Sequence, residues 1–225
     1  MDNITESDAT RAAIADQYSA AGFSGRVGFG RRPAVVVIDF AKAWLDPASP
    51  IGSDLSGAVA ETIRILRAAR ASGTPVFFTT MAFEPDLSDV GQNVLRKKRH
   101  TEVQSKGSEW VELDPALERR PDEVLIVKQR ASAFFGTPLL SQLIAHNVDT
   151  LIVTGCSTSG CIRASAQAAH DNNLRVIVPE GAVGDRNRAA HDSNIVDINA
   201  RMADVVDVDD VLSYLETVNE GEAPR

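Results

Sequence analysis

The stretch Ala34-Val35-Val36-Val37-Ile38 decides the fold of this chain. It is a continuous apolar run, mostly of β-branched residues, and a run of this kind is typical of a strand buried on both faces. Strands buried on both faces occur in parallel sheets whose two faces are covered by helices. This stretch therefore predicts an α/β domain.

Shorter apolar runs alternate with helical patterns along the rest of the chain. Residues 53–72 follow the first strand with apolar residues at helical spacing, and Gly73 ends this helix. Such alternation predicts a Rossmann-like doubly wound, six-stranded, mostly parallel sheet with helices on both faces and right-handed crossovers. We expect the other strands at 75–80, 124–127, 150–154, 175–178 and 205–206, and helices at 139–146, 162–170, 189–202 and after 206 through Tyr214.

No linker or repeat divides the chain into two folded units. Residues 1–32 are interpreted as an N-terminal arm, a flexible lead-in whose GRVGFG stretch lacks the lysine of a phosphate-binding loop. Residues 33–218 form the predicted domain, and the tail 219–225 is expected to be disordered. Within the domain, 83–121 is long, charged and weakly periodic. We expect this excursion to lie over the strand ends as a lid or an interface element.

Composition excludes several classes of protein. The 225 residues include 31 acidic and 23 basic ones, and the net charge of −8 argues against a nucleic-acid partner. No apolar stretch approaches the ~20 residues that span a bilayer, and residues 1–17 lack the apolar core of a signal peptide. Only two cysteines are present, Cys156 and Cys161, and their C-x4-C spacing excludes a zinc ribbon. We expect a cytoplasmic protein with neither nucleic acid nor a membrane as partner.

Polar residues that directly follow the predicted strands are the candidates for a site. In doubly wound sheets, active sites lie in the crevice beyond the carboxyl ends of the strands. Asp39 closes the first strand, Lys128 closes the third, and Cys156 and Cys161 lie in the turn after the fourth. The sequence therefore predicts a carboxylate, an ammonium group and a thiol at one edge of the sheet.

Cys161 is the favoured nucleophile because it falls in the first turn of the helix after the fourth strand. Free N–H groups and the positive end of the helix dipole favour a thiolate there and can hold an oxyanion. Asp39 could accept the thiol proton and later deliver it to a leaving amine, while Lys128 stabilises the anions. Taken singly, these residues could be a buried cysteine, a turn-forming aspartate and a solvated lysine. Only the three together indicate catalysis.

Other side chains near the strand ends are candidates for substrate contacts. Arg186 could bind a carboxylate in bidentate fashion, or form a surface ion pair with Asp185 or Asp192. The hydroxyl of Thr158 could serve a substrate or the backbone of its own turn. Four aromatic residues could wall an apolar pocket or belong to the core: Phe40, Trp44, Phe134 and Phe135.

Three segments together resemble the isochorismatase-like cysteine hydrolase superfamily: 36–40 (VVIDF), 127–137 (VKQRASAFFGT) and 153–164 (VTGCSTSGCIRA). Within it, CSTSGC and the later GDR are similar to the branch of N-carbamoylsarcosine amidohydrolase and maleamate amidohydrolase. The resemblance extends from about Arg32 to Val211. It implies a homo-oligomer, a dimer or a tetramer.

The resemblance also implies a role for each candidate. Asp39 matches the family's general acid/base aspartate, Lys128 its active-site lysine and Cys161 its nucleophile. A cis peptide bond is implied between Cys156 and Ser157, which would direct the N–H groups of Ser157 and Cys161 into an oxyanion hole. Cys156 is then a structural neighbour of the nucleophile.

The resemblance implies neither a metal nor another cofactor. The nicotinamidase branch holds a metal with an aspartate and several histidines near the second strand. This chain has 79–83 (TTMAF) there, and its four histidines lie elsewhere. We therefore expect no metal and no cofactor, and nicotinamide is disfavoured as a substrate.

These observations together predict a cysteine-dependent amidohydrolase. It is expected to release ammonia from a small carboxylate-bearing amide or carbamoyl compound, of the maleamate or N-carbamoylsarcosine type, through a thioester. The family branch uses an arginine at the GDR motif for the substrate carboxylate, which would be Arg186 here. A biuret, ureide or nicotinamide-type amidase is the alternative within the superfamily, and isochorismate hydrolysis is disfavoured because those members lack the cysteine. A thiol-redox protein or a non-catalytic oligomeric binding module is the alternative from another class.

Overall fold

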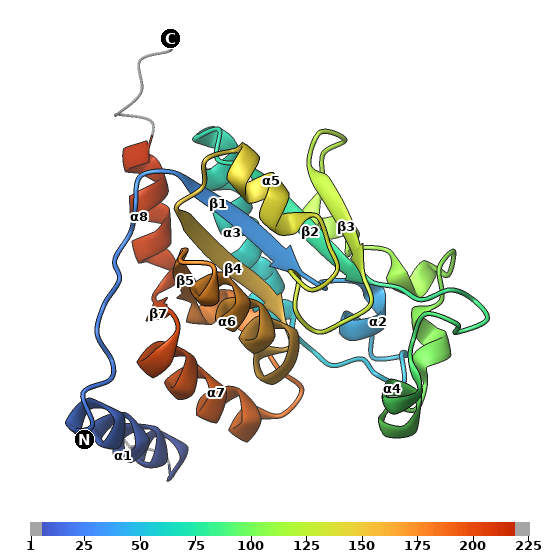
Figure 1. Cartoon of the computed structure of the whole chain (residues 1–225), viewed down its shortest axis with the longest axis horizontal. Helices are drawn as coiled ribbons and strands as arrows, with labels where there is room; N and C mark the ends of the chain where they lie inside the picture. Colours follow the sequence, from blue (N-terminus) through green and yellow to red (C-terminus); the bar gives the residue numbers. More distant parts are fainter. Residues whose placement is uncertain (1–5, 219–225) are drawn as a thin grey trace.

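A seven-stranded sheet forms the centre of the computed structural model, which describes residues 6–218 (Figure 1). Its order is β3-β2-β1-β4-β5-β7, with β6 paired to β4, and every pairing is parallel. The predicted α/β architecture is confirmed, and the sheet has one strand more than the six predicted, the two-residue strand β6. The strands are β1 Pro33–Ile38, β2 Val76–Met81, β3 Val124–Lys128, β4 Thr150–Cys156, β5 Arg175–Pro179, β6 Val183–Gly184 and β7 Asp204–Val206.

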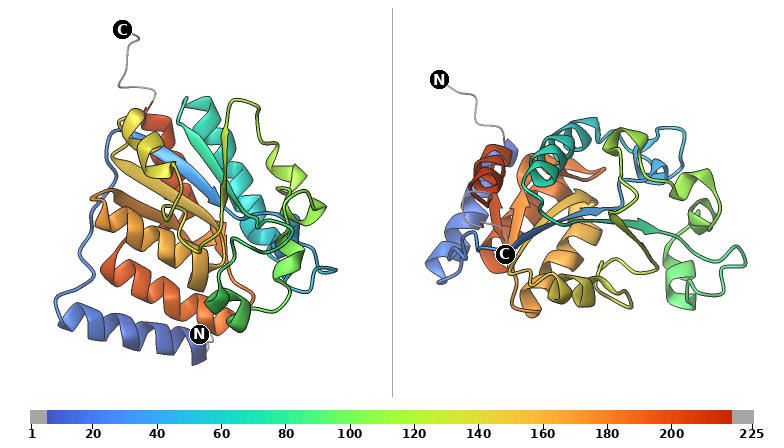
Figure 2. Two further views of the ribbon diagram at one scale, coloured as in Figure 1. Left: turned by 45° about the vertical axis from the view of Figure 1, so that its right-hand side comes forward. Right: turned by 90° about the horizontal axis from the view of Figure 1, so that it is seen from above.

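Helices cover both faces of this sheet (Figures 1 and 2). On one face α3 (Ser56–Ala71) and α8 (Val208–Val218) pack against the sheet. The other face is covered by α5 (Leu139–Ala145), α6 (Arg163–Asp171) and α7 (Arg188–Arg201).

The central strand β1 divides its side chains between the two faces. Val35 and Val37 belong to the core under α3 and α8, whereas Val36 and Ile38 belong to the core under α5, α6 and α7. All four are completely buried. The apolar run was therefore a correct signal of a central strand, because no position of β1 faces water.

The structure corrects the predicted lead-in. Residues 6–20 form helix α1 (Glu6–Ala20), which lies along α7 (Figures 1 and 2). Arg11 pairs with Glu180 at 2.8 Å, Tyr18 donates a hydrogen bond of 2.8 Å to Asp197, and Ser24 N donates to Ala200 O. The expectation of a flexible segment is wrong for this part because side-chain contacts with α7 and η5 (Glu180–Ala182) hold the helix in place.

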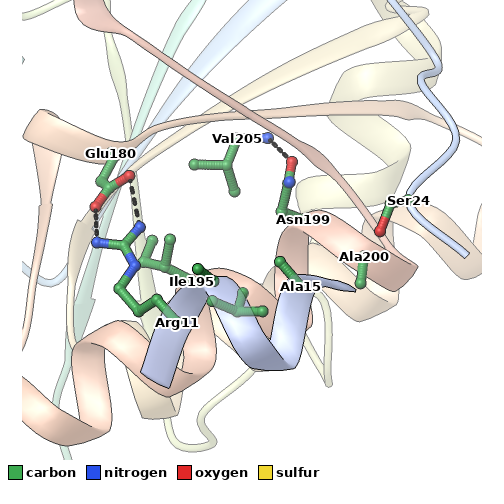
Figure 3. Close-up of a pocket in the computed structure, with 10 residues that line it drawn as sticks. Arg11, Ala15, Ser24, Glu180, Ile195, Asn199, Ala200 and Val205 are labelled. Atoms are coloured by element: carbon green, nitrogen blue, oxygen red, sulfur yellow. Dashed lines mark hydrogen bonds and ion pairs between the residues drawn. The ribbon is translucent and has the colours of Figure 1, made fainter. Parts of the chain in front are cut away.

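A cavity of about 270 Å³ lies between α1 and α7. Arg11 and Glu180 face each other at one side of it (Figure 3). It is lined by Ile195 and Asn199 of α7, among others, and by none of the residues predicted for the active site. This cavity is therefore separate from the predicted catalytic residues.

The excursion at 83–121 folds back onto the strand ends. It contains α4 (Gln92–Lys97) and three single turns, η1 (Thr101–Gln104), η2 (Glu109–Val111) and η3 (Pro115–Leu117). Phe83 pairs with Ser105 and Ala41 pairs with Leu113, just before α2 (Lys42–Leu45). The excursion thus lies beside the carboxyl ends of β1 and β2. The tail 219–225 lies outside the described residues, within which no helix is long and apolar enough to cross a membrane.

Candidate active site

Asp39 follows β1 directly and is completely buried. Its φ of 54° places it in the left-handed region, which is uncommon for a residue with a side chain and recurs at functional sites. Its backbone N–H donates to Thr79 O at 3.1 Å, and the Thr79 hydroxyl donates to Asp39 Oδ1 at 2.7 Å. Thr79 of β2 therefore fixes both the backbone and one carboxylate oxygen of Asp39.

Lys128 ends β3, and its ammonium group lies between the carboxylate and the thiol. Nζ lies 2.7 Å from Asp39 Oδ2 and 3.4 Å from Cys161 Sγ. It also donates to the carbonyl oxygens of Arg130 and Ala131, at 3.0 Å and 3.2 Å. Burial lowers the pKa of Lys128, but the neighbouring Asp39 and Cys161 outweigh it and leave that pKa above its usual value. The lysine is therefore a cation at neutral pH.

The second oxygen of Asp39 is placed to receive a proton. Among the described residues, Oδ2 accepts no hydrogen bond of good geometry, although Lys128 Nζ is 2.7 Å away. The ion pair is close but poorly aligned as a hydrogen bond, so its attraction is mainly between charges. A lone pair of Oδ2 remains for another donor, and the thiol of Cys161 interacts with this carboxylate.

Cys161 lies in a π-helical turn (Thr158–Ile162) that leads into α6, and 7% of its surface is exposed. Burial, followed by the charge of Asp39, raises the pKa of Cys161 to about 12, although Lys128 opposes the shift. The expected lowering by a helix N-terminus is therefore wrong for the free protein. Burial and the charge of Asp39 favour the protonated form, so the resting group is a thiol.

The close approach of β1 and β4 brings Asp39 beside the turn that carries Cys161. Ile38 pairs with Gly155, where φ is 115° and a Cβ would lie 2.0 Å from Ile38 O. Only glycine fits this position. The next residue, Cys156, is completely enclosed, and its Sγ lies 3.4 Å from Asp39 O. Burial raises the pKa of Cys156 well above its usual value, so it too is a thiol.

The peptide bond between Cys156 and Ser157 is cis, at the position that the family resemblance implies. Residues 157–162, here called the nucleophile turn, are closed by two bonds to Ser157 O. The N–H groups of Gly160 and Ile162 donate to it at 2.9 Å and 3.1 Å. Ser157 and Cys161 therefore lie on one compact loop.

The remaining candidates lie in different surroundings. Phe40 is completely buried in the core under α3, on the opposite face from Cys161, because its side chain continues the packing of Val35 and Val37. Trp44 and Phe134 are partly buried and pack against the core cluster that contains Cys161. Phe40 is thus a core residue, whereas Trp44 and Phe134 lie at the margin of the core, and Trp44 packs against both clusters.

Arg186 is exposed and extends over Trp44. Its guanidinium carbon lies 5.6 Å from the centre of the Trp44 ring, and its NH2 group donates to Ile51 O at 3.0 Å. The aspartates considered as its partners have other contacts. Asp185 accepts bonds from Ser159, and Asp192 pairs with Arg188.

The sequence analysis did not predict three contacts of the site. Thr79 holds Asp39, Asp185 holds Ser159, and the Thr158 hydroxyl is engaged by His191. The position of Thr79 at the end of the strand beside β1 is the one clue that could have identified it. His191 and Asp185 are recognisable only once the strand ends are packed. Within residues 6–218, no group of three or more His, Cys, Asp or Glu could hold a metal ion.

The family model of the isochorismatase domain matches residues 33–210. The chain belongs to the isochorismatase family. This confirms the resemblance on which the sequence prediction of a hydrolase rested. The match covers all seven strands and the residues that surround Cys161.

Two relatives of this chain are named as an amidase and an amidohydrolase. It is 37% identical over 209 residues to N-carbamoylsarcosine amidase from Arthrobacter, covering 91% of this chain and 79% of that protein. It is 38% identical over 191 residues to maleamate amidohydrolase from Pseudomonas putida, covering 84% and 90%. A solved cysteine hydrolase from Pseudomonas syringae shares the fold, with a TM-score of 0.81, 23% identity, and coverage of 86% of this chain and 97% of that one.

Proposed function

We propose that this isochorismatase-family protein is a cysteine-dependent amidohydrolase that releases ammonia from a small carboxylate-bearing amide or carbamoyl compound. One observation carries the proposal. Lys128 Nζ contacts both Asp39 Oδ2 and Cys161 Sγ, and all three side chains are buried at the carboxyl ends of the strands. A base, a cation and a nucleophile in contact are the groups that amide hydrolysis through a thioester requires.

The reaction begins with a thiol because the pKa of Cys161 is about 12. As Sγ attacks the substrate carbonyl carbon, its proton passes to Asp39 Oδ2, and the carbonyl oxygen becomes an oxyanion. The N–H groups of Ser157 and Cys161 are the proposed donors to that oxyanion. Lys128 remains charged beside both groups and stabilises the negative charge as it moves from the carboxylate to the sulfur.

The tetrahedral intermediate then loses ammonia. Asp39 gives its proton to the departing nitrogen, the C–N bond breaks, and a thioester of Cys161 forms. Water next attacks the thioester carbonyl while Asp39 accepts a proton from it. The C–S bond breaks, the proton returns to sulfur, and the acid leaves. The sum is one amide and one water converted to one acid and one ammonia.

Arg186 supports a substrate with a carboxylate. It is an exposed guanidinium that lies over Trp44, a ring that packs against the cluster containing Cys161. A guanidinium held over an aromatic ring retains N–H groups for a bidentate carboxylate contact. The two named relatives suggest maleamate and N-carbamoylsarcosine as the first compounds to test.

The test measures ammonia released from maleamate, N-carbamoylsarcosine, biuret and nicotinamide in the presence of a chelator. We expect release from one of the two carboxylate-bearing compounds by the wild type, and none by Cys161→Ala with an unchanged unfolding midpoint. Release that persists in Cys161→Ala would refute the cysteine mechanism. Release from biuret or nicotinamide alone would refute the substrate class.

The expected assembly and location belong to the same proposal, namely a cytoplasmic homo-oligomer. Apolar residues on the edge strand support the assembly, since Leu125 and Val127 of β3 are 39% and 43% exposed. Light scattering coupled to size exclusion should give a mass above that of one chain. A monomer at micromolar concentration would contradict the assembly.

A further inference from the structure

We propose that His191 is a positioning residue for the nucleophile turn. Its hydrogen bond to Thr158 is inferred to hold Ser157 and Cys161 in the geometry that the reaction needs. The inference rests on the proposed amide hydrolysis, and its test includes a measurement that needs no substrate.

The contact between His191 and Thr158 is short and enclosed. Thr158 Oγ1 and His191 Nδ1 lie 2.8 Å apart, and the two residues are 0% and 7% exposed. Water does not compete for a hydrogen bond in such a place, so the bond is stronger than at the surface, and each partner is left unpaired if the other is lost. Burial lowers the pKa of His191, so the ring is neutral at neutral pH.

Thr158 is well placed to transmit this contact to the reacting groups. It directly follows Ser157, whose N–H is a proposed donor to the oxyanion, and it begins the π-helical turn that contains Cys161. The oxyanion donors act only when they point at the developing charge, and a displacement of about 1 Å can reduce a rate by about 10²-fold. A side chain that pins Thr158 therefore acts on the rate through the turn.

A second contact ties the same turn to the start of α7. Asp185 Oδ2 accepts from the backbone N and the hydroxyl of Ser159, at 2.9 Å and 2.7 Å. Asp185 Oδ1 accepts from Asn187 N at 3.3 Å, and Asn187 caps α7 by accepting from Ala190 N at 2.9 Å. The segment from 185 to 191 thus holds two successive residues of the turn. His191 supplies the contact that is shielded from water.

His191 is not assigned a catalytic role because its ring contacts Thr158, and the groups that contact the thiol are those of Asp39 and Lys128. A positioning role makes a specific kinetic prediction. Loss of the contact should lower kcat with little change in KM, since the carboxylate contact and the base are intact. A histidine that only stabilised the fold would leave kcat unchanged well below the unfolding temperature.

The test compares Thr158→Val, His191→Leu and the double variant. Each single variant should lower kcat by about 10-fold to 100-fold, with KM within about threefold, and the double variant should match the worse single variant. Thr158→Ser and His191→Asn keep a hydrogen-bonding atom near the original position and should recover most of kcat. His170→Leu changes an exposed histidine on α6 and should leave kcat unchanged.

Hydrogen exchange supplies the measurement that is independent of substrate. In Thr158→Val and in His191→Leu, the peptide that covers 157–162 should exchange at least about tenfold faster, while peptides from β1 and β2 exchange as in the wild type. Multiplicative kcat losses in the double variant, or unchanged exchange in the nucleophile turn, would overturn the proposal. If the wild type hydrolyses none of the amides, the proposed function fails, and the exchange data still decide whether His191 positions the turn.

Discussion

Asp39 and Lys128 form an ion pair of 2.7 Å in which both side chains are completely buried. Removing two charges from water is expensive, and apolar residues of similar volume often stabilise a fold as well or better. A contribution to the stability of the fold is therefore a weak explanation for the presence of this buried ion pair. Its contact with Cys161 gives it a chemical role, because the same ammonium group faces both the proton acceptor and the sulfur.

The first prediction concerns the stability of this pair. Asp39→Asn leaves the Lys128 charge buried without its counter-charge and should lower the free energy of unfolding by about 3–5 kcal/mol. Asp39→Asn combined with Lys128→Met removes both charges and should recover a large part of that loss. Urea unfolding of the two variants measures the difference. A double variant less stable than the single one would show that the buried charge is not the cause.

The second prediction concerns the reactivity of the thiol. With a pKa of about 12, Cys161 is almost entirely protonated near pH 7. Its alkylation by iodoacetamide should therefore rise by about tenfold per pH unit from about pH 7 to 10, with no plateau near the usual thiol pKa of about 8.5. Mass spectrometry of the peptide that carries Cys161 gives the rate at each pH. A plateau below about pH 9 would contradict the burial effect.

The third prediction concerns stability at alkaline pH. Both thiols have a raised pKa in the folded protein, so above the unfolded value of about 8.5 the folded state binds more protons than the unfolded state. Their contribution to stability is complete below that pH and is lost as pH rises. The slope from each thiol should steepen from about −0.7 kcal/mol per pH unit at pH 8.5 to about −1.4 kcal/mol per pH unit near pH 10.

Cys161→Ala isolates one of the two thiols. Unfolding by urea in a reductant should show a slope near pH 10 that is smaller by about 1.4 kcal/mol per pH unit in this variant than in the wild type. Equal slopes would mean that Cys161 titrates at the same pH in the folded and unfolded chains.

The sequence predicted those elements whose burial is uniform or periodic along the chain. The apolar run at 34–38 identified β1, because a strand covered on both faces needs no polar position. Several short elements were not predicted, and for two of the missed elements the physical reason is clear. The strand β6 has two residues, too few for any pattern, and α1 is held through its polar side chains, with no continuous apolar stripe to indicate packing.

The residues of the candidate site were predicted from the sequence, but their contacts and protonation states were predicted only in part. Asp39, Lys128 and Cys161 were identified because each lies at or just after the end of a predicted strand. The carboxyl ends of parallel strands meet at one edge of the sheet, where the structure has the three side chains together. The protonation state of Cys161 was not predictable, since its burial, which raises the pKa of the thiol, depends on side chains from several distant segments. Contacts such as Thr158 with His191 depend on how α7 packs, which no local pattern contains.

The fourth prediction concerns the docking of α1. Arg11 donates two hydrogen bonds to the Glu180 carboxylate from a partly exposed position, so Arg11→Ala should lower the free energy of unfolding by about 1 kcal/mol. Hydrogen exchange in α1 should become faster, while exchange in β1 stays the same. Arg67→Ala, at an exposed arginine of α3, is the matched control. Equal exchange in the two variants would show that Arg11 does not hold α1.

The fifth prediction tests the carboxylate contact of Arg186. Arg186→Ala should raise KM for the active carboxylate-bearing amide by at least about tenfold, because a charge-assisted bidentate contact is lost. The methyl ester of the same amide has no carboxylate charge and should show the same KM with the wild type and the variant. Arg188→Ala removes another exposed arginine two residues further along the chain and should leave both KM values within about twofold.

Arg186→Lys separates charge from geometry at the same position. A lysine keeps the positive charge but offers neither the planar fork nor the same stacking over Trp44, which lies 5.6 Å from the guanidinium carbon. KM for the carboxylate-bearing amide should therefore be intermediate between those of the wild type and Arg186→Ala. If Arg186→Ala and Arg188→Ala give the same KM, the carboxylate is held elsewhere, and Arg186 serves only to pack over Trp44.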